Sequence, residues 1–182
     1  MTGTDSSADN ADPGLTLLGI YLNDHYAGST SGLELFRRAE AHHRGTPVGE
    51  TLSRLVTEVA EDRRALLEMM TALGVPVRQY KVAGAWAIEK VGRLKPNGPL
   101  KLNGRLLRRS PLSDLVEFEG MRLGVEGKVA GWRVLRVAAG RYDSLDPDRL
   151  DNLIARARRQ ADTLEELRLQ AAAAVVGATT SS

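Results

Sequence analysis

Four long stretches of the chain carry apolar side chains at the three- and four-residue spacing of an amphipathic helix. They cover about residues 15–44, 47–73, 111–139 and 147–176, and a capping residue followed by proline precedes each one. A capping oxygen accepts a hydrogen bond from an orphan backbone N–H, and proline at the first helical position has no N–H to satisfy. The pattern therefore predicts four helices, with no segment alternating convincingly at a period of two. The four dipeptides are Asp12-Pro13, Thr46-Pro47, Ser110-Pro111 and Asp146-Pro147.

Each predicted helix has one mainly apolar face, which we expect to point into the core of a bundle. In the helix over 15–44 this face holds Leu18, Leu22, His25, Ser29, Gly32 and Phe36. In the helix over 47–73 it holds Leu52, Leu55, Val59, Asp62, Leu66, Met69 and Leu73. In the helix over 111–139 it holds Leu112, Leu115, Val116, Glu119, Leu123, Glu126, Ala130, Val134 and Val137. In the helix over 147–176 it holds Leu150, Leu153, Ala157, Ala161, Leu164 and Ala171.

The lengths of the connections predict the topology. The first two helices, and likewise the last two, are joined by short turns, so each pair forms an antiparallel hairpin. Residues 74–110 form a long crossover that can return along the whole bundle, which would leave the second and third helices parallel. We expect this crossover to carry a short helix at about 80–92. The bundle then spans 13–176, between a disordered N-terminal tail over 1–12 and a flexible C-terminal tail over 177–182.

Two helical hairpins joined by one long crossover resemble the ferritin-like superfamily, and more closely an uncharacterised bacterial four-helix-bundle family with that fold. The resemblance covers roughly residues 15–176 in architecture and implies a ferritin-like four-helix bundle. Di-iron members use Glu-x-x-His motifs from two of the helices. This sequence contains no Glu-x-x-His, and its histidines are His25, His42 and His43, all in the first predicted helix. The usual iron-ligand motif therefore transfers to no residues of this chain.

Composition narrows the class of protein. Hydrophobic residues make up 42% of the chain but aromatic residues only 4%, so Leu, Val and Ala must build the core. The absence of Cys excludes disulfides, thiolate metal sites and cysteine nucleophiles. The N-terminus does not resemble a signal peptide and no apolar run is long enough to span a membrane, so we expect a cytoplasmic protein. The abundance of Arg, Ala, Gly and Leu is typical of a GC-rich bacterial genome.

Polar residues interrupt the apolar faces at similar heights in the predicted bundle. Folding each hairpin about its turn, with the second and third helices parallel, predicts one polar layer that contains His25, Asp62, Glu126 and Gln160. Glu58 lies about one turn from this layer and Glu119 about two turns. A buried carboxylate without a partner costs several kcal/mol, so these groups must be paired, protonated or metal-bound.

Three interpretations of this layer follow. In the first, Arg122 and Arg133 neutralise the acids in a structural network. In the second, His25, Asp62 and Glu126 bind a divalent metal (Fe, Mn or Zn), with Glu58 and Glu119 as further candidate ligands. In the third, the side chains reach solvent.

Interior glycines are a second unusual feature, because each costs about 1 kcal/mol relative to Ala in a helix. They occur as Gly28-x-x-x-Gly32, Gly120-x-x-x-Gly124 and Gly127-x-x-x-Gly131. They indicate close packing between helices or against a neighbouring subunit, or else room for a ligand against the backbone. A homo-oligomer is therefore one expectation.

The predicted crossover is basic. Between residues 90 and 109 it contains seven cations and no acid, beside a segment that holds Trp86. Such a segment could bind nucleic acid or an anionic membrane surface, or could be a solvated connection whose Trp86 packs on the bundle. The candidate polyanion-binding residues are Lys90, Arg93, Lys95, Lys101, Arg105, Arg108 and Arg109.

Taken together, the sequence predicts a ferritin-like helical bundle that is non-catalytic and has a buried polar layer. Two alternatives are a divergent metal-binding protein or metal-dependent enzyme that uses His25, Asp62 and Glu126, and a polyanion binder that uses the basic crossover. The residues indicate no substrate.

Overall fold

The computed structural model describes residues 12–78 and 111–177, and these residues form four long helices with no strand among them. The helices are α1 (Pro13–His42), α2 (Pro47–Ala72), α4 (Pro111–Ala138) and α5 (Pro147–Gly177). The prediction of an all-helical chain with four long helices is confirmed. No helix within the described ranges is long and apolar enough to cross a membrane.

Each helix begins at the proline of one of the four dipeptides. The Asp12 carboxylate accepts a hydrogen bond from the N–H of Gly14 at 2.9 Å, and the Thr46 hydroxyl accepts one from the N–H of Gly49 at 3.1 Å. Asp146 accepts one from the N–H of Asp148 at 2.9 Å. These side chains satisfy backbone donors that the helix itself leaves unpaired. Ser110, the fourth predicted cap, lies outside the described residues.

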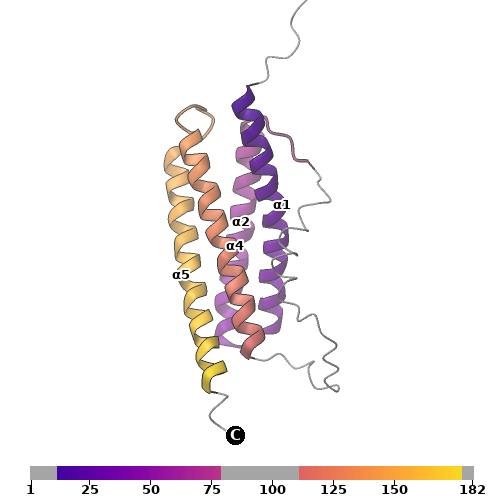
Figure 1. Cartoon of the computed structure of the whole chain (residues 1–182), viewed down its shortest axis with the longest axis vertical. Coiled ribbons are helices and arrows are strands. Elements are labelled where there is room, and N and C mark those ends of the chain that lie inside the picture. The colour runs from indigo at the N-terminus through magenta and orange to yellow at the C-terminus, as the bar shows by residue number, and fades with distance from the viewer. Residues whose placement is uncertain (1–11, 79–110, 178–182) are drawn as a thin grey trace, which may run out of the picture.

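The helices form two hairpins packed side by side (Figure 1). α1 and α5 run downward in this view, whereas α2 and α4 run upward, so α2 and α4 point in the same direction. The predicted crossover between them lies largely outside the described residues, as does its short helix. α1 packs against α2 and α4, and α5 packs against α4 and approaches α2.

The turn between α1 and α2 is tight and depends on two glycines. Gly45 has a φ of 79°, a left-handed conformation that glycine adopts without steric cost. Gly49, in the first turn of α2, lies against the backbone of the turn that follows α1, because a Cβ added to it would lie 2.1 Å from the carbonyl oxygen of His43. This position therefore has no room for any side chain.

The core between the hairpins consists mainly of aliphatic side chains and methionine, together with the buried aromatic residues Phe36, Phe118 and Trp132. The largest fully buried apolar side chains come from all four helices: Leu22, Leu52, Met70, Met121, Leu135, Leu150 and Leu164. Every residue of the predicted apolar faces of α2 and α5 is buried. On α1 the predicted face is only partly buried, with Leu22 and Phe36 in the core.

The predicted face of α4 is wrong. Its core face instead holds Phe118, Met121, Val125, Val129, Trp132 and Leu135. Leu112, Leu123 and Val137 of the predicted face are 57%, 62% and 81% exposed. α4 carries two apolar stripes on opposite sides, since successive residues turn by about 100° around a helix. The stripe with the bulkier aromatic side chains occupies the core.

Candidate functional site

One carboxylate lies in the centre of the bundle, between the two hairpins. Asp62 of α2 has 1% of its surface exposed. The Arg156 guanidinium of α5 donates to its Oδ1 atom, and the Lys128 ammonium of α4 donates to its Oδ2 atom. Both oxygens of the buried carboxylate therefore have a cationic partner from the other hairpin.

Gln160 of α5 completes this arrangement and is also 1% exposed. Its amide nitrogen donates to Glu58 at 2.8 Å and to Asp62 at 3.2 Å, and its amide oxygen accepts from Lys128. Arg156 donates in addition to Glu61 at 2.9 Å. We call Asp62, Lys128, Arg156 and Gln160 the Asp62 cluster, with Glu58 and Glu61 at its edge.

The two cations of the Asp62 cluster, Lys128 and Arg156, differ in how their surroundings shift their pKa values. Burial lowers the pKa of the Lys128 ammonium, and the neighbouring Asp62 carboxylate only partly opposes this effect. Burial also disfavours the charged form of Arg156, but the attraction of Asp62 and Glu61 outweighs it and raises the pKa of Arg156. The pKa values of the two cations are therefore shifted in opposite directions.

The predicted polar layer and the observed cluster share two residues, Asp62 and Gln160. The sequence predicts Glu126 beside Asp62, but Lys128 occupies that position instead. Two residues turn a helix by about 200°, so Glu126 lies on the opposite side of α4. It is half-exposed there, 3.7 Å from Arg122.

The other residues of the predicted layer lie away from Asp62 or at its edge. Glu58 contacts Gln160, as described above. Glu119 is exposed and lies 3.9 Å from Arg168 of α5. Arg122 pairs with Glu165 at 3.2 Å and Arg133 is exposed, so Lys128 and Arg156, not these two arginines, neutralise Asp62.

His25 packs against Tyr21 of its own helix and against Gly131 of α4. Its ring lies 4.4 Å from the ring of Tyr21, and it fills the space above Gly131 of α4, where an added Cβ would lie 3.2 Å from the imidazole Nδ1. Within the described residues, no group of three or more His, Asp or Glu side chains is arranged to hold a metal ion. The structure does not bring His25, Asp62 and Glu126 together as one ligand set.

Burial of His25 predicts a pH dependence of stability. Burial lowers the pKa of the imidazole from its usual value of 6.5, and Asp24 opposes this effect. The unfolded chain therefore binds this proton at a higher pH than the folded chain does. Between the lowered pKa and about 6.5 the free energy of unfolding should fall as the pH falls.

Urea denaturation of the wild type and of His25→Gln, each at pH 7.5 and pH 5, tests this dependence. The other titrating groups are common to both proteins, so the variant should lose less stability between the two pH values. An equal loss of stability in both proteins would show that protonation of His25 does not cause this pH dependence.

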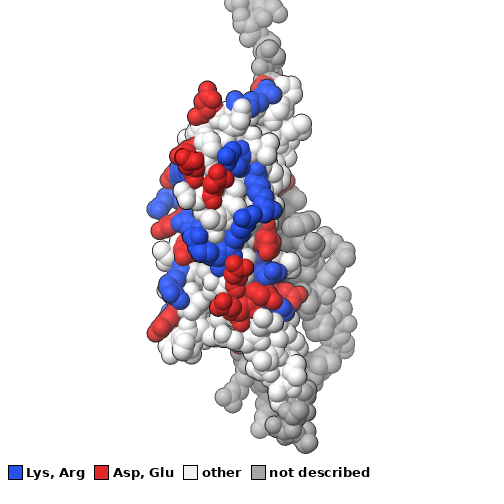
Figure 2. All heavy atoms as spheres, turned by 90° about the vertical axis from the view of Figure 1, so that its left-hand side faces the viewer, with Lys and Arg blue, Asp and Glu red and all other residues white. Residues whose placement is uncertain are grey.

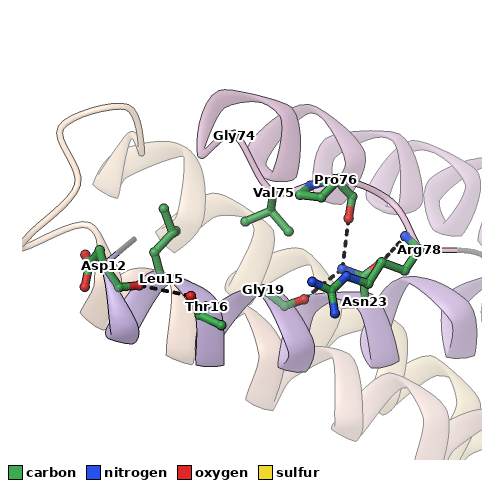
Figure 3. A pocket seen from close by; sticks show the side chains of 9 residues that line it. All are labelled: Asp12, Leu15, Thr16, Gly19, Asn23, Gly74, Val75, Pro76 and Arg78. Carbon is green, nitrogen blue, oxygen red and sulfur yellow. Dashed lines mark hydrogen bonds between the residues drawn. The ribbon is translucent and has the colours of Figure 1, made fainter. Parts of the chain in front are cut away.

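A shallow hollow of about 210 Å³ lies where the chain leaves α2 and passes along α1 (Figure 3). Buried Asn23 of α1 donates to the carbonyls of Gly19 at 2.8 Å and Pro76 at 3.1 Å, and accepts from the N–H of Arg78 at 2.6 Å. Both amide hydrogens of Asn23 are thus used within the protein. This hollow is a structural junction that ties the end of the first hairpin to α1.

Charges of both signs alternate over the face that α5 presents (Figure 2). Arg149 of α5 pairs with Glu68 of α2, and Arg168 pairs with Glu165 through two hydrogen bonds of 2.8 and 2.7 Å. The described part of this face therefore shows no extended surface of one sign. All seven candidate polyanion-binding cations lie outside the described residues.

Comparisons of this chain with protein-family models, with curated proteins and with solved structures give no match.

The Asp62 cluster contains two residues that the sequence analysis does not predict, Lys128 and Arg156. One signal was available for the first of them, because Lys128 is the one lysine within the described residues and arginine supplies their other permanent cations. Arg156 gave no comparable signal among the many arginines of its helix.

Proposed function

We propose that this chain is a non-catalytic helical scaffold of ferritin-like architecture, in which the Asp62 cluster takes the place of a metal centre. The observation that carries the proposal is the pairing of the buried Asp62 carboxylate with two cations, Lys128 and Arg156. A divalent ion at Asp62 would have to displace or approach both positive charges. A carboxylate paired in this way suits a structural role and not metal ligation.

The ferritin-like part of the proposal is supported by helix direction. α2 and α4 point the same way, and the predicted crossover between them is long enough to return along the bundle (Figure 1). The absence of Glu-x-x-His from the sequence separates this chain from the di-iron members of that superfamily. A cytoplasmic location and a homo-oligomeric state stay predictions.

The cluster also gives the scaffold a physical role. Asp62, Glu58 and Glu61 belong to the first hairpin, whereas Lys128, Arg156 and Gln160 belong to the second. α2 and α5 approach each other closely at few positions, and the hydrogen bonds of Arg156 and Gln160 to Asp62, Glu61 and Glu58 join these two helices. The cluster thereby fixes which faces of the two hairpins meet.

Metal analysis of the natively purified protein tests the proposal. We expect no stoichiometric Fe, Mn or Zn, and a thermal unfolding midpoint that stays the same when each metal or EDTA is added. A metal bound at one ion per chain, and lost in both His25→Ala and Asp62→Asn, would overturn the scaffold proposal in favour of the metal-dependent alternative. His42→Ala is the matched control, because it removes an exposed imidazole at the end of α1.

A further inference from the structure

A groove of about 240 Å³ lies between α2 and α5, next to the Asp62 cluster. Two buried side chains, Leu55 of α2 and Gln160 of α5, line its inner part and are 4% and 1% exposed. The groove thus reaches a polar side chain of the cluster. Half-buried and exposed polar residues of both helices line the rest of it: Thr51, Arg54, Glu58, Arg159 and Thr163.

Ion pairs outside the groove give the relative heights of α2 and α5. Arg149 pairs with Glu68, and Arg156 pairs with Glu61. Between these two pairs, α5 advances by seven residues and α2 goes back by seven. Residues of the two antiparallel helices therefore correspond one to one along this side of the bundle.

The same correspondence places the groove residues in two levels, accurate to about one helical turn. Arg159 of α5 is level with Glu58 of α2, and Thr163 of α5 is level with Arg54 of α2. The two arginines are thus on opposite sides of the groove, with a height difference of four residues. This difference is about 6 Å at 1.5 Å per residue, so both guanidinium groups can reach one small ligand between them.

Neither arginine of the groove pairs with a carboxylate of the described residues. Arg54 donates to the hydroxyl of Thr51 at 3.4 Å. Glu58 is level with Arg159, but its carboxylate accepts from the buried amide of Gln160 at 2.8 Å. A guanidinium group has five N–H donors. Most donors of the two arginines are therefore available to a ligand.

The other polar groups of the groove are acceptors. The Thr51 hydroxyl donates to the carbonyl of Pro47 at 3.1 Å, and the Thr163 hydroxyl donates to the carbonyl of Arg159 at 3.0 Å. Their single hydroxyl hydrogens are thus used within their own helices. Glu58 adds a carboxylate, which accepts hydrogen bonds and attracts a cation. The groove therefore presents two cations and one anion to a ligand.

We propose that this groove binds a small phosphate monoester that also carries an ammonium group. The oxygens of a phosphate point in several directions and can accept from guanidinium groups on opposite helices, whereas the two coplanar oxygens of a carboxylate match a single guanidinium. Glu58 accepts from the ammonium group of the same molecule. The volume is below the range of about 300–1,000 Å³ typical of drug-sized ligands, which limits the ligand to a few non-hydrogen atoms beyond the phosphate.

This binding role goes beyond the proposed scaffold and does not depend on it. The cations that neutralise Asp62 are Lys128 and Arg156, whereas the groove uses Arg54 and Arg159. Failure of the ligand to bind would therefore leave the metal analysis and its conclusion unchanged.

Titration of the full-length ¹⁵N-labelled protein with phosphoethanolamine and with inorganic phosphate, at low ionic strength, tests the proposal. Both should cause saturable shifts of amide resonances in residues 51–58 and 159–163. Phosphoethanolamine should bind about threefold more tightly, because its ammonium group gains the contact with Glu58. The absence of saturable shifts in these residues would overturn the proposal.

Arginine variants separate a specific site from general attraction to a basic protein. Arg54→Gln and Arg159→Gln should each weaken phosphoethanolamine binding by about tenfold or more, since each removes charge-assisted hydrogen bonds. Both side chains are exposed, so the variants should keep the circular dichroism spectrum of the wild type. Arg133→Gln is the matched control, because it removes an exposed arginine of α4 and changes the net charge equally. Equal weakening in all three variants would contradict a site in the groove.

Glu58→Gln tests the assignment of the ammonium group. Its amide oxygen can still accept from Gln160, so the floor of the groove should be preserved. In this variant phosphoethanolamine should lose its advantage over inorganic phosphate, while inorganic phosphate binds at least as tightly as before. An unchanged preference for phosphoethanolamine would show that Glu58 does not receive the ammonium group.

Discussion

Replacing Asp62 by alanine should lower the free energy of unfolding by about 3–5 kcal/mol, because two cations would stay in the centre of the bundle without their carboxylate. Lys128 would keep one acceptor, Gln160, and Arg156 would keep Glu61. Neither acceptor lies between the two cations as Asp62 does. Urea denaturation of the full-length protein, followed by circular dichroism, measures the change.

An exposed ion pair supplies the control for this substitution. Asp151 pairs with Arg136 at 3.1 Å, and these side chains are 56% and 44% exposed. Asp151→Ala should cost less than about 1 kcal/mol of the free energy of unfolding, since exposed pairs contribute little.

Replacing Asp62 by Leu together with Lys128 and Arg156 by Met should recover much of the stability lost in Asp62→Ala, because no unpaired charge is then buried. If Asp62→Ala cost no more than Asp151→Ala, the central role of the cluster would be wrong.

The second large effect is expected at Gly49. A methyl group there would lie about 2 Å from the carbonyl oxygen of His43, which is backbone and cannot rotate away. Gly49→Ala must therefore displace the turn between α1 and α2 or the first turn of α2. We expect a loss of about 2–3 kcal/mol in the free energy of unfolding, comparable to other overpacked positions.

Gly28→Ala is the matched control for Gly49→Ala. Gly28 also lies within a helix, but the added methyl group meets no described atom within 4 Å. The higher helix propensity of alanine should leave the free energy of unfolding unchanged or raise it by up to about 1 kcal/mol. A loss at Gly28 as large as that at Gly49 would show that the tight turn is not the cause.

The helices themselves were predictable from local chemistry. A capping side chain followed by proline acts through hydrogen bonds within a few residues, so helix starts such as Pro47 and Pro147 can be recognised without tertiary structure. The apolar faces of α2 and α5 were equally clear, because each of these helices has one dominant apolar stripe.

The face of α4 was not predictable in this way. Its two apolar stripes both follow helical spacing, and only packing against the other helices selects the stripe with Phe118 and Trp132. The wrong face turned the predicted layer toward Glu126 and away from Lys128. The predicted positions of Asp62 and Gln160 are correct because these residues lie on α2 and α5, whose buried faces were predicted correctly.

The two hairpins are complementary in charge where they meet in the Asp62 cluster. The first hairpin brings the carboxylates Glu58, Glu61 and Asp62, and the second brings the cations Lys128 and Arg156. Two copies of the first hairpin packed through this surface would bury acids against acids, and two copies of the second would bury cations against cations. Like-charge contacts of this kind are a means of rejecting wrong partners. The cluster thus favours the pairing of unlike hairpins, and separate peptides corresponding to the two halves would select each other over themselves.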